Sequence, residues 1–462
     1  IISPVLTKDE LHEIIAIALS KGGDFAEVFI EENHATTVAC EDDLIEKLAS
    51  GVDAGAGLRV ISGRETAYAA SADGSFSALK EAAVRLAASL DRQKSVKEIS
   101  LTTQPPKTPD IKRRPHQVPL NEKIQMVNLL NKTARAYGSR IKQVTVRYTD
   151  SNQAVSIANS DGLYVEDNRI RTRYFIQVIA EKNGVLQTGY EAPGGTVGFE
   201  LFDLYPPEQL AAKAAERALL MLDASHAPAG KMMVVISAEA GGTLIHEACG
   251  HSLEADFIAK GTSVFSGKVG RQVASRLVTV VDDATLPGKF GTCAVDDEGT
   301  PGQKTILIEN GILKGFLTDR FNAKALGIPL SGNGRRESFR QKPVPRMTNT
   351  LIAPGQMDPQ EIIASVQNGL LVKRMGGGQV NVTNGDFVFE ISEGYLIENG
   401  KIKHPVRGAI LTGNGPRVLE TIDLVGNDLG WQTGVCGKYD HAPVGDAQPT
   451  IRIPEIIVGG RL

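Results

Sequence analysis

The segment GGTLIHEACGHSLEAD, residues 241–256, holds two histidines and a glutamate that directly follows the first of them. Imidazoles bind zinc and a neighbouring carboxylate can accept a proton from water, so His246, Glu247 and His251 have the residue types of a zinc hydrolase. The usual zinc-peptidase helix, H-E-x-x-H, places its histidines four residues apart. Here they are five apart, which on a regular helix turns them about 140° from each other. Both can hold one ion if the helix is loosened locally, for instance by a π-bulge, and we expect this distortion beside Gly250.

A third metal ligand is expected because catalytic zinc usually takes three protein ligands and leaves a position for water. Two residues have suitable chemistry: Cys436 in GVCGK, and Glu254, three residues after His251. Spacing alone leaves both open. Cys249, inside the motif, is interpreted as a small buried side chain that packs the helix. The alternative for the whole motif is a histidine buried by chance, but its position after a strand and a glycine turn favours a site.

Residues beyond the motif could serve the same reaction. A tetrahedral oxyanion needs an electrophile besides the metal, and His441 and Tyr439 follow Cys436 closely enough to be candidates. A pair of surface loop residues is the alternative. Arg346, together with Arg335 and Arg336, could bind the C-terminal carboxylate of a peptide. For these arginines, structural ion pairs are the other possibility, with the acidic residues Asp296, Asp297 and Asp386.

The elements that must position these residues follow from periodicity and from turn signals. Four amphipathic helices are predicted at 7–22, 76–92, 119–137 and 206–223. Residues 25–72 predict a meander of about four strands with turns near Gly51 and Gly63. Further strands are predicted at 141–148, 153–158, 163–168, 170–182 and 185–191. A buried strand at 231–237 leads into the motif helix, expected from Thr243 to Lys260, and glycine-punctuated strands follow it.

The fold class is therefore α+β, with a helix and antiparallel-sheet region first and a β-rich region that carries the motif helix. With 462 residues the chain is too long for one ordinary core. The proline- and charge-rich segment 94–118 is the expected linker or crossing segment. The predicted divisions are 1–93, 94–118, 119–229 and a C-terminal metallopeptidase-like domain at 230–462.

Composition excludes several classes of function. The net charge is −4 and the pI about 6.1, so we expect no nucleic-acid partner, and the short cluster at 112–114 is interpreted as solvated linker charge. No apolar run approaches the roughly 18 residues that span a bilayer, so no membrane partner is expected. No signal peptide is visible at the start of the sequence. The four cysteines lack pairing-like spacing, which favours the cytoplasm.

Several blocks together resemble the TldD/PmbA family of peptidases. The blocks, in order, are HEACGHSLEADFIAKGTSVFSGKVG, DDEGTPGQ, SGNGRRESF, PRMTNT, GGGQVNVTNGDFVF and GVCGK. Their order and spacing match the family from about residue 230 to the C-terminus, and GAGLRVISGRETAYA at 55–69 is similar to its N-terminal domain.

This resemblance implies a function. TldD-type chains of the family carry H-E-x-x-x-H and the late cysteine, whereas PmbA-type (TldE) chains lack the motif and act as non-catalytic partners. The chain keeps the motif, so the resemblance implies that His246, His251 and Cys436 bind Zn²⁺ and that Glu247 is the general base. It also implies a homodimer, or a heterodimer with a PmbA/TldE-type subunit, that cleaves short or unfolded peptides in leader-peptide trimming or degradation. The alternative is a non-catalytic peptide-binding or chaperone-like subunit.

Overall fold

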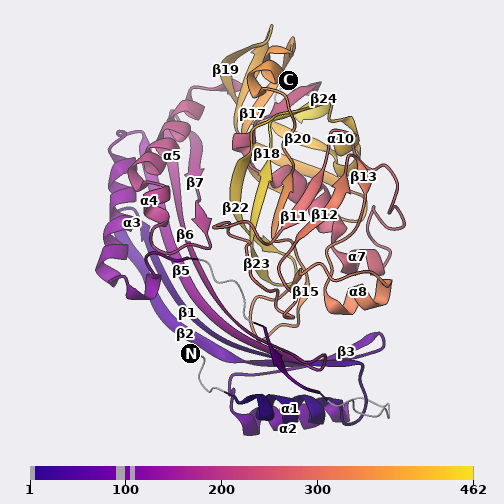
Figure 1. Cartoon of the computed structure of the whole chain (residues 1–462). Coiled ribbons are helices and arrows are strands. Elements are labelled where there is room, and N and C mark those ends of the chain that lie inside the picture. Colours follow the sequence, from indigo (N-terminus) through magenta and orange to yellow (C-terminus); the bar gives the residue numbers. More distant parts are fainter. Residues whose placement is uncertain (1–5, 90–98, 105–109, 461–462) are drawn as a thin grey trace.

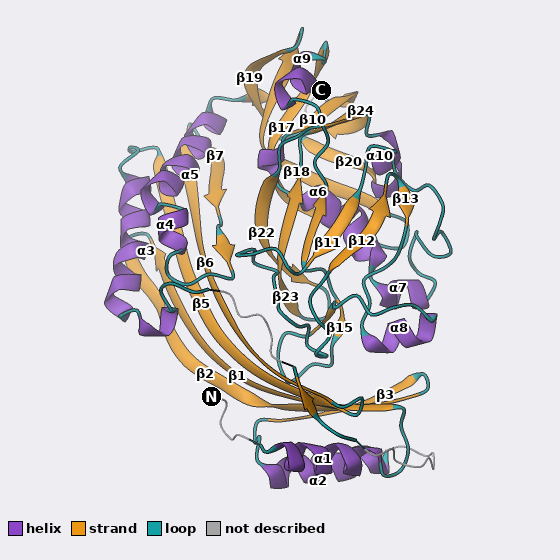
Figure 2. Cartoon of the chain, in the orientation of Figure 1, coloured by secondary structure: helices purple, strands orange, loops and turns teal. Residues whose placement is uncertain are grey.

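The computed structural model describes residues 6–89, 99–104 and 110–460. Figure 1 shows that long strands of the first half form one strongly curved sheet, and that the second half lies against its inner side. Helices cover the outer side of this sheet, and the second half is rich in strands (Figure 2). The predicted α+β class is confirmed.

The N-terminal sheet has the strand order β3-β2-β1-β5-β6-β4, with β7 and β8 also paired to β6. Antiparallel pairing of β1 with β5 runs from Glu27–Asn159 to Glu41–Thr145, so residues on both sides of the predicted linker share one sheet. The predicted linker lies partly outside the described residues, and the domain boundaries stay predictions. The strands are β1 (Phe25–Glu41), β2 (Leu44–Ser62), β3 (Glu65–Ser71), β4 (Thr102–Thr103), β5 (Ile141–Asn159), β6 (Leu163–Lys182), β7 (Val185–Glu191) and β8 (Gly194–Gly195).

These strands are fewer and longer than the sequence predicts. The turn expected near Gly51 is wrong, because Gly51 lies inside β2 opposite Ala35. The chain turns instead at Asp42 and Asp43, both with positive φ (48° and 71°), a conformation that aspartate tolerates in hairpins. The turn at Gly63 is confirmed by its φ of 61°. The predicted breaks at 149–152 and at 169 are also wrong, because those polar residues stay paired within β5 and β6.

The four predicted helices are confirmed, with slightly different ends, and residues 90–92 of the second lie outside the described part. The capping box of α1 is present: Glu10 N donates to Thr7 Oγ1 at 3.2 Å, and Thr7 N donates to Glu10 Oε2 at 2.8 Å. Helix α5 packs closely on the sheet, since a Cβ on Gly189 of β7 would lie 2.0 Å from Ala214 O. The helices are α1 (Lys8–Leu19), α2 (Phe76–Ala88), α3 (Leu120–Arg135), α4 (Leu201–Leu204) and α5 (Pro207–Leu222), with a 3₁₀ turn at Pro115–Gln117.

The C-terminal half contains two larger sheets and one small pair, β14–β15. One sheet has the order β17-β10-β24-β20-β18-β19-β9, with β21 paired to β24, and the other has the order β13-β12-β11-β16-β23-β22. Most strand pairs in these sheets are antiparallel, but β10–β17, β16–β23 and β19–β9 are parallel, because long connections let the chain return in the same direction.

The C-terminal strands are β9 (Ser225–His226), β10 (Gly230–Ile236), β11 (Val280–Asp283), β12 (Lys304–Glu309), β13 (Ile312–Leu313), β14 (Gly334–Arg335), β15 (Val344–Pro345), β16 (Asn349–Ile352), β17 (Asn368–Val380), β18 (Asp386–Glu398), β19 (Lys401–Arg407), β20 (Ile410–Asn414), β21 (Leu424–Val425), β22 (Gly430–Gly437), β23 (His441–Gln448) and β24 (Ile451–Gly459). Helices α8 (Arg320–Leu326), α9 (Pro359–Ala364) and α10 (Gly415–Thr421) lie among them. The main apolar core of this half surrounds the motif helix, and it includes Leu244, Ile245, Ala248, Cys249 and Leu253.

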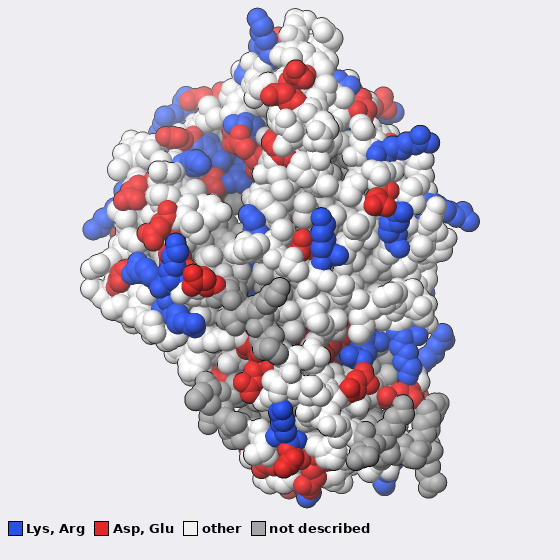
Figure 3. All heavy atoms as spheres, in the orientation of Figure 1, with Lys and Arg blue, Asp and Glu red and all other residues white. Residues whose placement is uncertain are grey.

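Charged side chains are mixed on the surface. Figure 3 shows basic and acidic groups interspersed over the face in view. In the predicted basic cluster, Arg113 donates to Glu122 at 2.5 Å and lies over the Phe199 ring, 4.8 Å from its centroid; this arginine therefore makes structural contacts rather than being simply solvated. Among the described residues, no helix is long and apolar enough to span a membrane.

Candidate metal centre

The motif helix changes its geometry at the histidines. Helix α6 (Thr243–Ile245) continues as a π-helical turn over His246–Gly250, and a 3₁₀ turn covers His251–Leu253. The N–H of His251 bonds to the carbonyl of His246, five residues back. Because a π-turn holds more residues per turn than an α-helix, it offsets the angle that five-residue spacing would otherwise create. The predicted distortion is confirmed.

The sequence predicts one motif helix from Thr243 to Lys260, and this prediction is wrong because the helix is interrupted at Glu254. Glu254 is extended (φ −75°, ψ 128°) and separates the 3₁₀ turn from α7 (Ala255–Ala259). Glu254 forms a β-bridge with Leu317, and Ala255 N donates to Leu317 O at 2.8 Å. This tertiary pairing competes with the helical hydrogen bonds and turns the Glu254 side chain back toward the histidines.

Two glycines let other strands approach the motif closely. A Cβ on Gly250 would lie 2.2 Å from Sδ of Met347, whose side chain is buried. A Cβ on Gly242 would lie 2.3 Å from the backbone N of Ala447 in β23. The absence of side chains at these positions therefore lets the motif pack directly against the segments that carry other residues of the site.

We expect Gly250→Ala to destabilise the protein by about 1–3 kcal/mol, because the added methyl group overpacks the buried contact with Met347. Chemical denaturation measures this change in the free energy of unfolding. Gly315→Ala is the matched control, because a Cβ at Gly315 has no atom within 4 Å. Equal free energies of unfolding for the two variants would show that the Met347 side chain can move away without loss of stability.

The structure brings His246, His251 and Cys436 together. Their nearest side-chain nitrogen and sulfur atoms all lie within 4.8 Å of one another. Sγ of Cys436 is 3.1 Å from Nε2 of His246 and 3.2 Å from Nε2 of His251. The two imidazole rings are nearly perpendicular, at 89°, with centroids 4.9 Å apart. Three donor atoms thus converge on one point from two segments of the chain.

Each imidazole is oriented by a carboxylate on its other nitrogen. Nδ1 of His246 lies 2.7 Å from Oδ1 of Asp446, and Nδ1 of His251 lies 3.1 Å from Oε2 of Glu254. Both carboxylates are buried. Metal-binding histidines commonly have such a partner, which fixes the ring and leaves Nε2 free to coordinate. Glu254 therefore occupies the position of an orienting group, and Cys436 that of the third donor.

The electrostatics of the cluster favour a thiolate. Burial alone would raise the pKa of Cys436, but hydrogen bonds from the two imidazoles and their charge lower it to about 5. For His251, burial opposes protonation, yet the charge of Glu254 raises its pKa to about 9. The carboxylate of Asp446 likewise raises the pKa of His246 well above its usual value, against the effect of burial. Positive charge on the two imidazoles therefore stabilises a buried thiolate at Cys436.

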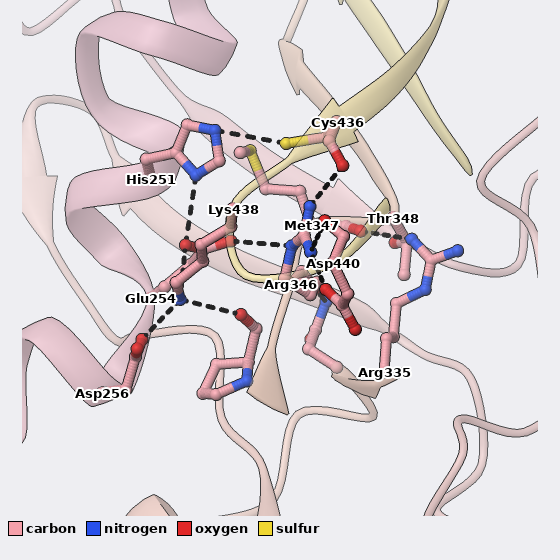
Figure 4. A network of polar contacts seen from close by, with 12 residues as sticks. His251, Glu254, Asp256, Arg335, Arg346, Met347, Thr348, Cys436, Lys438 and Asp440 are labelled. Carbon is pink, nitrogen blue, oxygen red and sulfur yellow. Dashed lines mark hydrogen bonds and ion pairs between the residues drawn. The ribbon is translucent and has the colours of Figure 1, made fainter. Parts of the chain in front are cut away.

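A buried network of hydrogen bonds and ion pairs contacts the backbone at Cys436 and the residues next to it (Figure 4). Arg346 donates to the carbonyl of Cys436 at 2.5 Å and also bonds to Asp440. Nζ of Lys438 lies 3.0 Å from Glu254 and 2.7 Å from Asp256. This network ties β22 to the motif helix, so the third donor and the orienting group of His251 are fixed by the same contacts.

Glu247 lies beside the donor atoms and faces a cavity of about 540 Å³. Burial raises the pKa of Glu247, an effect that the nearby histidines partly offset. Its carboxylate has no hydrogen-bond partner among the described residues and is free to meet a ligand. The rest of the cavity is lined by β22, β23, the end of β17 and Phe257.

The candidate oxyanion and substrate contacts do not lie in this cavity. Arg346 is fully buried, and its guanidinium donates to the carbonyl of Cys436 and to Asp440 rather than lining the cavity. The Tyr439 side chain is exposed, near Lys438 and Lys260. Its neighbour His441 pairs with Glu337 at 3.2 Å and lines a separate cavity. In this chain neither His441 nor Tyr439 reaches the donor cluster.

Arg336 and Arg346 form ion pairs, but with Glu27 and Asp440 rather than with Asp296, Asp297 or Asp386. Arg336 donates to the carbonyl of Asp297 and to the carboxylate of Glu27, at 2.7 Å each. Arg335 donates to the carbonyl of Met347 at 2.6 Å and has no acidic partner among the described residues. Asp386 bonds to asparagines near its own turn rather than to an arginine.

Sequence reasoning missed Asp446 and Lys438. Asp446 is one of many acidic residues, and its role depends on β23 lying against the motif, which no local pattern indicates. For Lys438 the signal was weak but present, since it lies in the GVCGK block next to Cys436. Its ion pair with Glu254 depends on the packing of two distant segments.

The site combines a buried set of two histidines and one cysteine with a carboxylate beside a cavity, and these are residue types that metallohydrolases use as metal ligands and base. The chain belongs to the TldD/PmbA metallopeptidase family and is a TldD-type member. Three family models match it in succession: PmbA/TldA metallopeptidase domain 1 over residues 26–90, the central domain over 113–222 and the C-terminal domain over 229–460.

Named relatives agree with this assignment. A Haemophilus influenzae protein named metalloprotease TldD homolog is 38% identical over 468 residues, covering 98% of this chain and 97% of its own. A Buchnera aphidicola protein of the same name is 36% identical over 458 residues, covering 95% and 93%. A Methanocaldococcus jannaschii metalloprotease is 35% identical over 439 residues, covering 93% and 96%.

Solved structures share the fold. The crystal structure of TldE from Thermococcus kodakarensis superposes with a TM-score of 0.76 at 21% identity, covering 98% of this chain and all of that chain (100%). A Thermotoga maritima protein superposes with a TM-score of 0.79 at 22% identity, covering 98% and 100%. The architecture described above is therefore shared with known proteins over 98% of the chain.

Proposed function

We propose that the protein is a zinc-dependent peptidase that hydrolyses short or unfolded peptides. The observation that carries the proposal is the convergence of His246, His251 and Cys436 beside Glu247, in a cavity open to a ligand. The family membership and the metalloprotease names of the relatives support the same activity.

The donor set fits zinc. Zinc accepts imidazole and thiolate together, and three protein ligands leave a position for water or substrate. Tetrahedral zinc places a bound nitrogen and sulfur about 3.6 Å apart, and the sulfur–nitrogen distances here are 3.1 and 3.2 Å. Small outward movements of the side chains would accommodate the ion, and the carboxylates on both imidazoles complete the expected surroundings.

Different residues of the chain have separate roles in the proposed hydrolysis. When bound, zinc supplies Lewis acidity that polarises water and the peptide carbonyl. Glu247 accepts the proton that the attacking water loses and then delivers it to the leaving amine. Asp446 and Glu254 keep Nε2 of each histidine directed at the centre, and Arg346 and Lys438 hold the strand of Cys436 in place.

Peptide binding is proposed along β22. Within the described part of the chain this strand is the last of its sheet, and it pairs with β23 on one side. Its free edge borders the cavity of the cluster. An extended peptide can add to such an edge through backbone hydrogen bonds, which gives affinity with little dependence on sequence. This binding mode suits unfolded substrates in leader-peptide trimming or degradation.

We further propose that the protein acts as a dimer in the cytoplasm. The likeness to TldE supports a heterodimer with a PmbA/TldE-type subunit, and a homodimer is the alternative. All four cysteines are free thiols, as a reducing compartment requires. A chamber between two subunits would limit access to unfolded chains.

Metal removal tests the proposed activity. We expect purified protein to contain about one zinc per chain and to cleave short unstructured peptides. A chelator should abolish cleavage, and stoichiometric zinc should restore it. Mass spectrometry of the products and elemental analysis of the protein provide the measurements. Metal-free protein that binds peptides without cleaving them, even after zinc is added with a TldE-type subunit, would favour the non-catalytic alternative.

A further inference from the structure

A second cavity, of about 340 Å³, lies between the inner face of the N-terminal sheet and the hairpin of β22 and β23. It differs from the cavity of the donor cluster in its charge. Arginines from alternate positions of β6 and from the segment at 334–336 line it, together with Val435, His441 and Pro443 of the hairpin. The arginines that line it are Arg169, Arg171, Arg173, Arg335 and Arg336.

Three of these arginines have no acidic partner among the described residues. Arg171 is buried, and its one hydrogen bond is from Nε to the carbonyl of Phe290 at 3.3 Å. Arg335, also buried, donates to one carbonyl, that of Met347. Nε of Arg173 is buried without a hydrogen-bond partner. An uncompensated buried charge is costly, so these guanidinium groups call for an anion.

Four acidic residues also line the cavity, and each is engaged by other groups: Asp150, Asp296, Asp297 and Glu337. Asp150 pairs with Lys123 at 2.6 Å, and Glu337 accepts a hydrogen bond from N of His441 at 2.9 Å. Asp297 pairs with Arg169, and Arg336 N donates to it at 2.8 Å. Asp296 accepts three backbone N–H groups, at 2.8–3.0 Å, and burial raises its pKa well above the usual value. Burial, then the charges of Arg335 and Arg169, lower the pKa of Arg171 to about 10. With these carboxylates engaged, Arg171, Arg173 and Arg335 stay without an ion-pair partner among the described residues.

The hairpin places this cavity next to the donor cluster, on the opposite face. Cys436 pairs with Ala442, and the neighbouring pair is Val435 with Pro443. Successive residues of a strand point to opposite faces, and paired residues share a face. Cys436 accordingly faces the metal site while Pro443 and His441 line the arginine cavity, and Val435 lines both cavities. A peptide strand added to the edge of β22 would likewise alternate its side chains between the two cavities.

We propose that the arginine-lined cavity is a subsite for a carboxylate of the bound peptide, adjacent to the scissile bond. The carboxylate belongs to an aspartate or glutamate side chain on the face opposite the metal, or to the C-terminus of a peptide that ends at the cavity. Paired donors of a guanidinium group match a carboxylate in geometry as well as in charge. The inference rests on the proposed peptidase function and adds a substrate preference to it.

Matched peptides test the preference without altering the protein. The set consists of unstructured peptides in pairs. One kind of pair differs only by Glu or Gln at a single position, and this position is moved along the peptide. The other kind differs only by a free or an amidated C-terminus. We expect kcat/KM with one acidic member to exceed that with its neutral counterpart by about 10- to 100-fold, the worth of a charged hydrogen-bonded pair. Dependence on the side chain identifies an acidic residue, and dependence on the terminus identifies the C-terminal carboxylate. Equal rates for all acidic and neutral members would overturn the subsite.

Variants then connect the preference to the cavity. Arg171→Gln and Arg335→Gln are expected to reduce the ratio of acidic to neutral kcat/KM, while cleavage of the neutral peptide and the zinc content stay near wild type. Arg340→Gln is the matched control, because Arg340 pairs with Asp53 at the surface. Thermal unfolding shows which variants are folded. An unchanged ratio in both folded variants contradicts the assignment.

Binding separates this inference from the peptidase proposal. Fluorescence anisotropy measures the affinity of labelled acidic and neutral peptides for wild-type protein without zinc. If no peptide is cleaved, the peptidase proposal fails. The ratio of the affinities for the acidic and the neutral peptide still tests the subsite. Arginine-dependent preference supports it, and equal affinity overturns it.

Discussion

Glu247→Gln is expected to lower kcat for peptide hydrolysis by about 10²- to 10⁴-fold while zinc stays bound. Glutamine keeps the size and polarity of the side chain but cannot accept the proton that water loses. The metal ligands are unchanged, and the Glu247 carboxylate makes no hydrogen bond with other described residues that its loss would break. Steady-state kinetics with a short unstructured peptide, together with elemental analysis of the same preparation, measure both quantities.

Glu239→Gln is the matched control for this variant. Glu239 lies just before the motif, is exposed and pairs with Lys373 at 3.3 Å, so its loss should leave activity near wild type. A Glu247→Gln variant with full activity would exclude Glu247 as the base. A variant that loses zinc as well as activity would instead give Glu247 a part in holding the metal.

The sequence is enough to select the three residues that the structure brings together, but not to predict their surroundings. The five-residue spacing of His246 and His251 requires a locally widened helix, and the structure has a π-turn there. Cys436 and Glu254 could not be ranked as ligands by spacing. Their roles separate in the structure because Glu254 leaves the helix to bridge with Leu317, which places its carboxylate behind the imidazole.

The parts that sequence reasoning missed depend on contacts between distant segments. Asp446 meets His246 because β23 lies against the motif, and Gly242 makes that approach possible. Arg171 and Arg335 share a cavity because the curved sheet wraps around the second half of the chain. Periodicity describes one strand or helix at a time and carries no information about such packing.

Strand length shows the same limit. Polar residues inside β5, such as Asp150, look like turn signals when read locally. In the structure Asp150 is buried and bonds to Lys123 of α3 at 2.6 Å, so the strand continues through it. Because Lys123 pairs with the charge of Asp150, this residue can be buried within a strand. The sequence alone does not show this partner, and so it predicts a break inside β5.

Cys436→Ala is expected to remove most of the bound zinc and to abolish hydrolysis, because two histidines without the thiolate make an incomplete site. We expect the zinc affinity to fall by at least about 100-fold, more than the loss of an orienting group costs. Competition with a chromophoric chelator measures the affinity, and peptide kinetics at saturating zinc show whether catalysis can be rescued.

The same motif provides the matched control, Cys249→Ala. Both cysteines are buried, but their surroundings differ: burial raises the pKa of Cys249, whereas the histidines lower that of Cys436 to about 5. Cys249 faces the core and contacts the carbonyl of Ile245 at 3.6 Å, so its truncation should cost about 1 kcal/mol of stability and leave the zinc affinity unchanged. Equal zinc affinity of the two variants would contradict Cys436 as a ligand. A selective loss in Cys436→Ala would tie the C-terminal hairpin to the metal, and with it the edge of β22 along which we place the peptide.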